Sequence, residues 1–379
     1  MTTAAGRLSN RLCMRSRFYP WLFALLLLAG CQEQPPLKVG YVGGLTGRVA
    51  GLGVAGRDGA LMAVEEINRD GGIKGRRLEL LARDDQQNAE VATRVTRELI
   101  DAKVVGLIGP MTSAMAMTLQ PLVNQHNIVL ISPTVTTNRL NDLDDHFFRL
   151  TYPLKTNAEK TVDYALAHNL KKFAVTIETG NAAFTEDWFE SFRQPFEAAG
   201  GQIVHVERFK SGEEGGFLEL VRRVLEKQPD AVLLLSGAMD AALTAQQVRK
   251  LGSGAVLFSS EWGFTSDIIN FGGGAVEGML AFVTYDPDSK APAHTLFLTN
   301  FEKRFGYKPS FAAVLAYEST RFLAAGLERN PRREGLKEAL LRIGAFEGLQ
   351  GAVRMGRYGD AERQTYLGTV RDGHFTTIQ

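Results

Sequence analysis

The chain has 379 residues, which is more than a single core usually holds. Hydrophobic residues make up 45% of it and charged residues 22%, which is the composition of a soluble globular protein. We therefore expect about two domains. The formal net charge is +1, and four arginines but no acidic residue lie in residues 1–30, so the remainder is slightly acidic. This balance gives no electrostatic basis for nucleic-acid binding.

The N-terminus has the pattern of a secretory signal peptide over residues 1–30. Basic residues precede a short apolar run (WLFALLLL) that is too short to span a bilayer as a helix. The run leads into Leu28-Ala29-Gly30-Cys31, which resembles a bacterial lipobox. The resemblance implies a lipid anchor on Cys31, followed by a tether over residues 31–36. A plain secretory signal with a chance cysteine is the alternative.

From residue 37 onward, short apolar runs alternate with helical patterns, which predicts βαβ units and parallel sheets. The first set comprises strands at 37–42, 77–82, 104–108 and 128–132, and helices at 57–68, 88–101 and 113–125. A second set comprises strands at 172–177, 203–209, 231–236 and 256–259, and helices at 185–199, 216–228 and 239–251. Helices at 291–305 and 312–328 follow, and a C-terminal hairpin turns at Asp372-Gly373. Two successive sets predict an α/β fold with two Rossmann-like lobes.

The segment Gly51-Leu52-Gly53-Val54-Ala55-Gly56 is a literal GxGxxG ahead of the first expected helix. A dinucleotide fold places this turn directly after its first strand, with an acidic residue about 20 residues further on. Neither spacing fits here. We interpret the segment as a glycine-rich loop that passes close to a ligand or to the other lobe.

Three loops follow the carboxyl ends of expected strands, where open α/β sheets bind ligands. Residues 109–113 open a helix whose free N–H groups favour an anion, unless Thr112 or Ser113 is only an N-cap. Residues 132–138 are rich in hydroxyls, which also suit ordinary turns. Glu261 can pair with an ammonium group while Trp262 packs the apolar part of a ligand; an exposed surface pair is the alternative.

Nothing in the sequence indicates catalysis, a metal or a cofactor. Both cysteines, Cys13 and Cys31, lie at the N-terminus, and the six histidines are scattered. There is no HExxH, CxxC or GxSxG motif, and Asp84-Asp85 is more typical of a solvated strand end than of a catalytic pair.

Four segments resemble the periplasmic leucine/isoleucine/valine-binding proteins, the type I solute-binding components of branched-chain amino-acid ABC transporters. They are KVGYVGGLTG at 38–47, GRDGALMAVEEINRDGGIKGR at 56–76, LIGPMTS at 107–113 and ISPTVT at 131–136. The resemblance covers the whole mature chain. It implies two lobes joined by a three-crossing hinge, lobe 1 from 37–151 plus 282–346 and lobe 2 from 152–281 plus 347–379.

The same resemblance implies a binding site shared by the two lobes. Ser113 and Thr136 would hold a ligand α-carboxylate, Thr134 and Glu261 would receive its ammonium, and Leu52 and Phe184 stand where the family has aromatic residues. An aromatic residue of the family near position 237 is absent here, which puts leucine specificity in doubt.

We therefore expect a monomeric solute-binding protein, not an enzyme, that closes on a small ligand, an amino acid first of all, and delivers it to an ABC permease. A ligand sensor, or a clamp for an amide, a urea-like molecule or an aromatic acid, is the alternative. The expected location is the periplasm, with Cys31 anchored in the membrane. Gln32, which is not aspartate, favours the outer membrane in a Gram-negative host.

Overall fold

The computed structural model describes Met1, residues 34–213 and residues 216–378. The expected signal peptide and Cys31 lie outside the described residues. The chain divides after residue 35 into two units, of which the second, residues 36–379, holds nearly all the described residues. All elements below belong to the second unit, and no helix among the described residues is both long and apolar enough to cross a membrane.

The first lobe is built on a five-stranded sheet in which all strands are parallel, in the order β2-β1-β3-β4-β5. Its strands are β1 (Leu37–Gly43), β2 (Leu78–Asp84), β3 (Gly106–Ile108), β4 (Leu130–Ser132) and β5 (Phe147–Arg149). Side chains from both faces are buried, as the continuous apolar runs predict. One core lies under α3 (Ala89–Asp101) and α4 (Ser113–Gln125), and another under α2 (Ala50–Arg69) and α11 (Phe311–Arg329).

The second lobe is built on a seven-stranded mixed sheet, in the order β15-β14-β10-β9-β8-β6-β7. Its parallel part consists of β6 (Lys172–Glu178), β7 (Gln202–Phe209), β8 (Ala231–Leu235), β9 (Val256–Ser259) and β10 (Leu280–Val283). The antiparallel hairpin β14 (Tyr366–Arg371) and β15 (His374–Ile378) completes it. Asp372 and Gly373 both have positive φ angles, so the predicted turn is confirmed.

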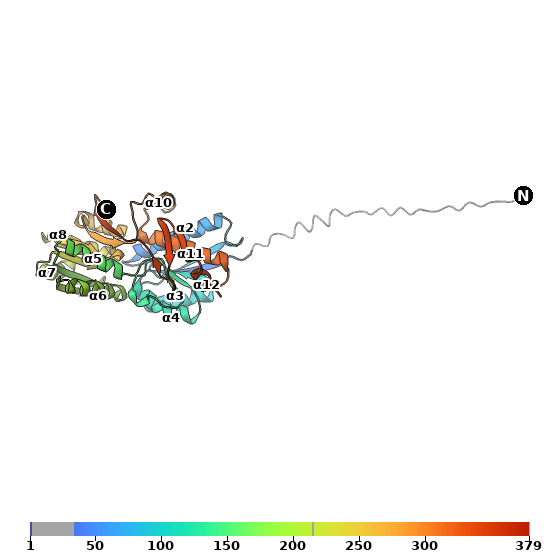
Figure 1. Ribbon diagram of the computed structural model, residues 1–379, viewed down its shortest axis with the longest axis horizontal. Helices are drawn as coiled ribbons and strands as arrows, with labels where there is room; N and C mark the ends of the chain where they lie inside the picture. Colours follow the sequence, from blue (N-terminus) through green and yellow to red (C-terminus); the bar gives the residue numbers. More distant parts are fainter. Residues whose placement is uncertain (2–33, 214–215, 379) are drawn as a thin grey trace. The chain divides into compact units, whose positions relative to one another are not determined.

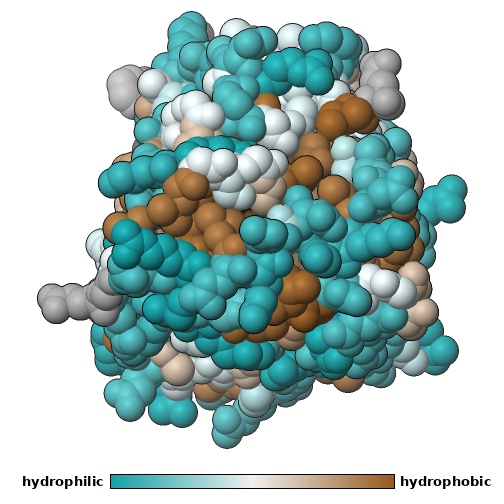
Figure 2. Space-filling model, turned by 90° about the vertical axis from the view of Figure 1, so that its left-hand side faces the viewer, coloured by the Kyte–Doolittle hydropathy of each residue, from teal (hydrophilic) through white to brown (hydrophobic). Residues whose placement is uncertain are grey.

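Helices cover both faces of this second sheet. Within the described chain they are α5 (Lys155–Ala167), α6 (Ala182–Ala198), α7 (Phe217–Leu225), α8 (Ala238–Lys250) and α9 (Ser266–Gly272). Figure 1 shows α5 to α8 grouped around this sheet, with α2, α3, α4 and α11 around the other. The end of the molecule that faces the viewer in Figure 2 is largely hydrophilic, with hydrophobic residues visible in hollows between polar ones.

The lobe boundaries remain a prediction. Pairing with β9 and β14 holds β10 in the second sheet through Val283. The helices α10 (Pro292–Phe305), α11 and α12 (Leu336–Leu341) return to the first lobe, where α11 packs along α2. A small antiparallel sheet, β11 (Ala345–Gly348), β12 (Gly351–Met355) and β13 (Ala361–Glu362), follows.

The expected glycine-rich loop at 51–56 is wrong, because these residues form the first turns of α2, which begins at Ala50 and not at residue 57. The expected close approach is confirmed. A β-carbon on Gly53 would lie 2.0 Å from the carbonyl oxygen of Gly44, and one on Gly51 would lie 2.0 Å from Oδ2 of Asp267 in the second lobe. The glycines therefore let this helix approach its neighbours at backbone distance.

Candidate functional site

Side chains from both lobes line one buried cavity of about 20 Å³. Six of the residues that the sequence singles out are among them: Leu52, Ser113, Thr134, Phe184, Glu261 and Trp262. The seventh, Thr136, does not line the cavity but lies next to it. Its hydroxyl donates a hydrogen bond to Oε1 of Glu261 at 3.2 Å. The structure thus brings all seven together, and their roles toward a ligand remain a prediction.

The N-terminal end of α4 faces this cavity from the first lobe. Thr112 occupies the N-cap position but does not cap the helix, because its hydroxyl donates to Oε1 of Gln87 at 2.8 Å. The N–H of Ala114 donates instead to Oδ1 of Asn181, a second-lobe residue, at 2.9 Å. Ser113 is buried beside it and lines the cavity. The helix end therefore presents N–H donors and a hydroxyl to the interface between the lobes.

Glu261 faces this helix end from the second lobe, in the short helix η2 (Glu261–Gly263) that follows β9. Only 9% of it is exposed, so the alternative of a surface pair is wrong. Burial raises the pKa of its carboxyl to about 6, although hydrogen bonds lower it in part. Besides Thr136, the indole N–H of Trp188 donates to Oε2 at 3.1 Å. This buried carboxylate is short of positive charge, and a cationic group would restore its usual ionisation.

Apolar side chains form the remaining walls of the cavity. Phe184 and Trp262 meet edge to face, with ring centroids 5.9 Å apart at 86°. Leu52 comes from the first turn of α2, and Phe311 from the first residue of α11. A ligand that reaches the polar groups therefore has its apolar part enclosed by rings and aliphatic carbons.

The hydroxyl-rich loop after β4 combines turn chemistry with contact between the lobes. Ser132 accepts from the N–H groups of Thr134 and Val135, and the Thr134 hydroxyl donates to the Met111 carbonyl oxygen at 2.7 Å. The Thr134 side chain is therefore used locally. The next hydroxyl, that of Thr136, turns to the second lobe.

Direct hydrogen bonds and ion pairs between the lobes show that the clamp is closed. Arg48, before α2, pairs with Asp240 of α8 at 2.5 Å and donates to the hydroxyl of Ser211 at 3.0 Å. Asp187 of α6 accepts from the Thr137 hydroxyl and from the Asn138 N–H, both at 2.7 Å. The cavity has room for about one water molecule, so an organic ligand needs the lobes to move apart.

The family model described as "Periplasmic binding protein" matches residues 36–374. The chain belongs to this family. A Leu/Ile/Val-binding protein of Rhizobium johnstonii is 25% identical over 347 residues, 87% of this chain and 90% of that protein. A leucine-, isoleucine-, valine-, threonine- and alanine-binding protein of Pseudomonas aeruginosa is 25% identical, over 93% of this chain and 95% of that protein.

Solved structures show the same fold. A branched-chain amino-acid transporter substrate-binding protein of Streptococcus pneumoniae, in complex with isoleucine, has a TM-score of 0.84 at 23% identity and covers 90% of this chain and 99% of its own. A solute-binding protein of an ABC transporter from R. palustris, in complex with benzoate, has a TM-score of 0.83 at 21% identity, over 90% of this chain and 95% of its own. The expected two-lobed type I fold is confirmed, and these relatives are binding proteins.

Sequence reasoning missed two polar residues of the site, both on or next to α6. Asn181 precedes this helix, and Trp188 lies two turns into it. Asn181 could have been suspected from its position after a strand of the second set. Trp188 carries no such signal, because an aromatic residue on an amphipathic helix usually belongs to the core. Within the described residues, no group of three or more His, Cys, Asp or Glu side chains is placed to hold a metal ion.

Proposed function

We propose that this protein binds an amino acid with an apolar side chain between its lobes and delivers it to an ABC permease. The observation that carries the proposal is the opposed pair of polar groups across one buried cavity. Ser113 and the N-terminal end of α4 lie on the first lobe, and the Glu261 carboxylate lies on the second. An α-carboxylate and an α-ammonium match these two groups in sign and in position.

Closure of the lobes supplies the binding energy. When Glu261 and the α4 end come together around a zwitterion, water leaves and each charge-assisted hydrogen bond strengthens. The oxygen of Asn181 already occupies one N–H of the helix end. A ligand carboxylate would take its place, so binding exchanges one acceptor for a charged one.

Two classes of ligand have to be compared, because the relatives bind branched-chain amino acids or aromatic acids. The rings of Phe184, Trp262 and Phe311 suit either. Glu261 decides between them, since a buried carboxylate repels a ligand that carries only negative charge and attracts one that brings an ammonium. The site therefore favours an amino acid over a benzoate.

The experiment is a calorimetric titration of the mature protein, stripped of ligand by unfolding and refolding, with leucine, isoleucine, valine, phenylalanine and benzoate. We expect an amino acid to bind more tightly than benzoate. Glu261→Ala should then cost roughly 2–5 kcal/mol of binding free energy, because the ammonium loses its partner. The control is Glu226→Ala, an exposed glutamate at the end of α7. Unchanged affinity in Glu261→Ala would refute the site.

Delivery to a permease and attachment to the membrane extend the proposal. We expect the protein to act as a monomer in the periplasm, held by acyl chains on Cys31; two chains can anchor a protein stably where one cannot. The test compares the wild type with Cys31→Ala by mass spectrometry and membrane fractionation. Release of the variant into the soluble periplasmic fraction supports the anchor. Equal membrane retention of both proteins contradicts it.

A further inference from the structure

A second and larger cavity lies next to the ligand cavity, and Phe311 lines both. Its volume is about 650 Å³, within the range of roughly 300–1,000 Å³ that small-molecule sites occupy. The ligand cavity as closed here holds no more than a water molecule. The larger cavity thus offers an organic molecule room without any movement of the lobes.

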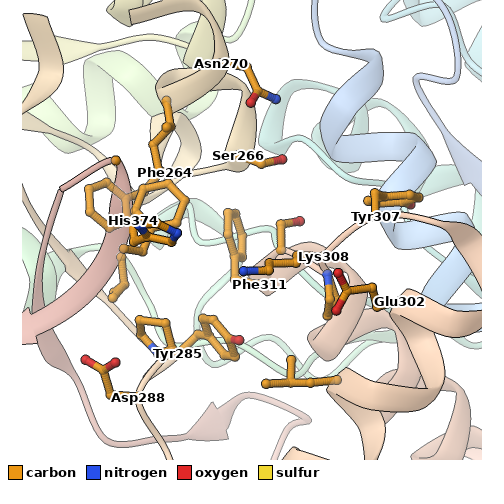
Figure 3. Close-up of a pocket in the computed structure, with 18 residues that line it drawn as sticks. Phe264, Ser266, Asn270, Tyr285, Asp288, Glu302, Tyr307, Lys308, Phe311 and His374 are labelled. Atoms are coloured by element: carbon orange, nitrogen blue, oxygen red, sulfur yellow. The ribbon is translucent and has the colours of Figure 1, made fainter. Parts of the chain in front are cut away.

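Both lobes contribute walls to this cavity, as Figure 3 shows. Phe264 and Ser266, just after η2, and Phe375 of β15 come from the second lobe. Phe264 and Phe375 pack together, with ring centroids 4.4 Å apart. Phe311 comes from the first lobe, and Tyr285 lies in the segment that leads from β10 to α10. The aromatic walls from the two lobes face the same space only while the lobes are together.

Two opposite charges stand at the first-lobe side of the cavity. Lys308 lies in the middle of the lining residues in Figure 3, and Glu302 of α10 lies to one side of it. Both are exposed, and neither forms an ion pair with another residue in the ranges 34–213 and 216–378. The nearby Arg304 forms an ion pair with Glu65 and is not one of the lining residues.

Two other polar side chains of the lining are already engaged, whereas the buried hydroxyl of Ser310 has no hydrogen-bond partner among the described residues. Asp288 accepts from the Thr376 hydroxyl at 2.6 Å and from the Thr377 N–H at 2.9 Å. The Tyr285 hydroxyl shares a hydrogen bond with His294 at 3.2 Å. The charges left available to an occupant are therefore one ammonium and one carboxylate, beside a volume walled by rings.

We propose that this cavity is a second ligand site, specific for a large apolar amino acid. Its ring or branched chain packs between the aromatic walls, its carboxylate pairs with Lys308, and its ammonium pairs with Glu302. A zwitterion is the small molecule that matches both free charges and the apolar walls at once. Because both charges are exposed, each pair adds little, and burial of the apolar side chain supplies most of the affinity.

The test examines this cavity in a protein whose first site has been weakened. In Glu261→Ala protein, phenylalanine is titrated by calorimetry and compared with 3-phenylpropionate, which lacks the ammonium, and phenethylamine, which lacks the carboxylate. We expect phenylalanine to bind at one site and both analogues to bind several-fold more weakly. Adding Lys308→Met should reduce the affinity for phenylalanine to that for phenethylamine, while the control Lys303→Met, an exposed lysine of α10 outside the lining, changes nothing.

A steric variant tests the position of the site independently. Ser266→Trp places an indole in the cavity and should abolish the remaining phenylalanine binding, with an unchanged circular dichroism spectrum showing that the fold is intact. If this variant unfolds, Lys308→Met decides alone. Loss of all phenylalanine binding in Glu261→Ala, or phenylalanine binding that is insensitive to Lys308→Met, would overturn the second site. The first of these outcomes leaves the Glu261 site standing, so the two proposals fail separately.

Discussion

Glu261 should make the protein less stable at neutral pH, and its replacement by glutamine should reveal this. The folded protein raises the pKa of this carboxyl from 4.5 to about 6, because burial outweighs the hydrogen bonds that lower it. Each pKa unit corresponds to 1.36 kcal/mol, so ionised Glu261 costs about 2 kcal/mol of folding free energy at pH 7. The folded protein thus carries a destabilising charge at the position proposed for the ligand.

The sign of the pH dependence follows from the same shift. Between pH 4.5 and 6 the native state holds a proton on Glu261 that the unfolded chain has released. The contribution of Glu261 to stability therefore falls as the pH rises through this window. Glu261→Gln keeps the shape of the side chain, accepts from Trp188 through its oxygen and donates to a reoriented Thr136 hydroxyl. It should raise the free energy of unfolding by about 1–2 kcal/mol at pH 7.5 and by almost nothing at pH 4.5.

The assay is urea unfolding at the two pH values, on wild type and variant freed of ligand by refolding. Asp85, whose pKa burial also raises to about 6, titrates in the same window in both proteins and cancels in the comparison. The same variant should lose amino-acid binding. An equal gain at both pH values would mean that packing, not charge, is responsible, and no gain at pH 7.5 would refute the reasoning.

Three further substitutions test the clamp and its supports. Arg48→Ala leaves the buried Asp240 without its cation and should cost the closed state on the order of 1–3 kcal/mol, seen as a larger radius of gyration in X-ray scattering. Trp188→Phe removes a donor to Glu261, worth about 1.5–3 kcal/mol, and should raise the pKa of that carboxyl by about 1–2 units in ¹³C NMR titration. Gly53→Ala pushes a β-carbon against a backbone carbonyl and should lower the unfolding free energy by about 1–3 kcal/mol.

The arginine and glycine variants each have a matched control, and all three substitutions have a contrary outcome. Arg304→Ala breaks an ion pair within the first lobe and should leave the radius of gyration unchanged; the same response from both arginine variants would contradict the closure contact. An unmoved Glu261 titration would contradict the role of Trp188. Gly254→Ala meets no atom within 4 Å, so a loss as large as that of Gly53→Ala would exclude close packing as the cause.

Elements with strong local signals are predictable from the sequence, and those shaped by contact with distant segments are not. Strand β9 covers the predicted residues 256–259, and α4 covers the predicted 113–125, because apolar period and flanking loops agree there. The predicted start of α2 is wrong, because Gly51 and Gly53 have low helix propensity and so indicate a loop locally. They are present for close packing against the loop after β1 and against α9, which one sequence does not show.

The candidate site divides in the same way. Ser113, Thr136 and Glu261 lie at the carboxyl ends of strands, where chain order and sheet topology alone bring polar groups to one edge. Asn181 depends on how the start of α6 meets the first lobe, and Trp188 on how α6 packs beside η2 within the second lobe, and tertiary packing sets both. The small sheet β11–β13 was missed because its strands are short and half exposed.

Neither lobe is a continuous piece of chain. The first sheet is complete by residue 149, yet α11, more than 160 residues later, covers one of its faces, and the second sheet closes only with the last strand, β15. During synthesis, the face of the first sheet under α11 and the edge of the second sheet therefore stay uncovered until most of the chain has been made. Completion of both lobes depends on contacts between residues far apart in the chain, which slows folding and leaves apolar surface open to aggregation in the meantime.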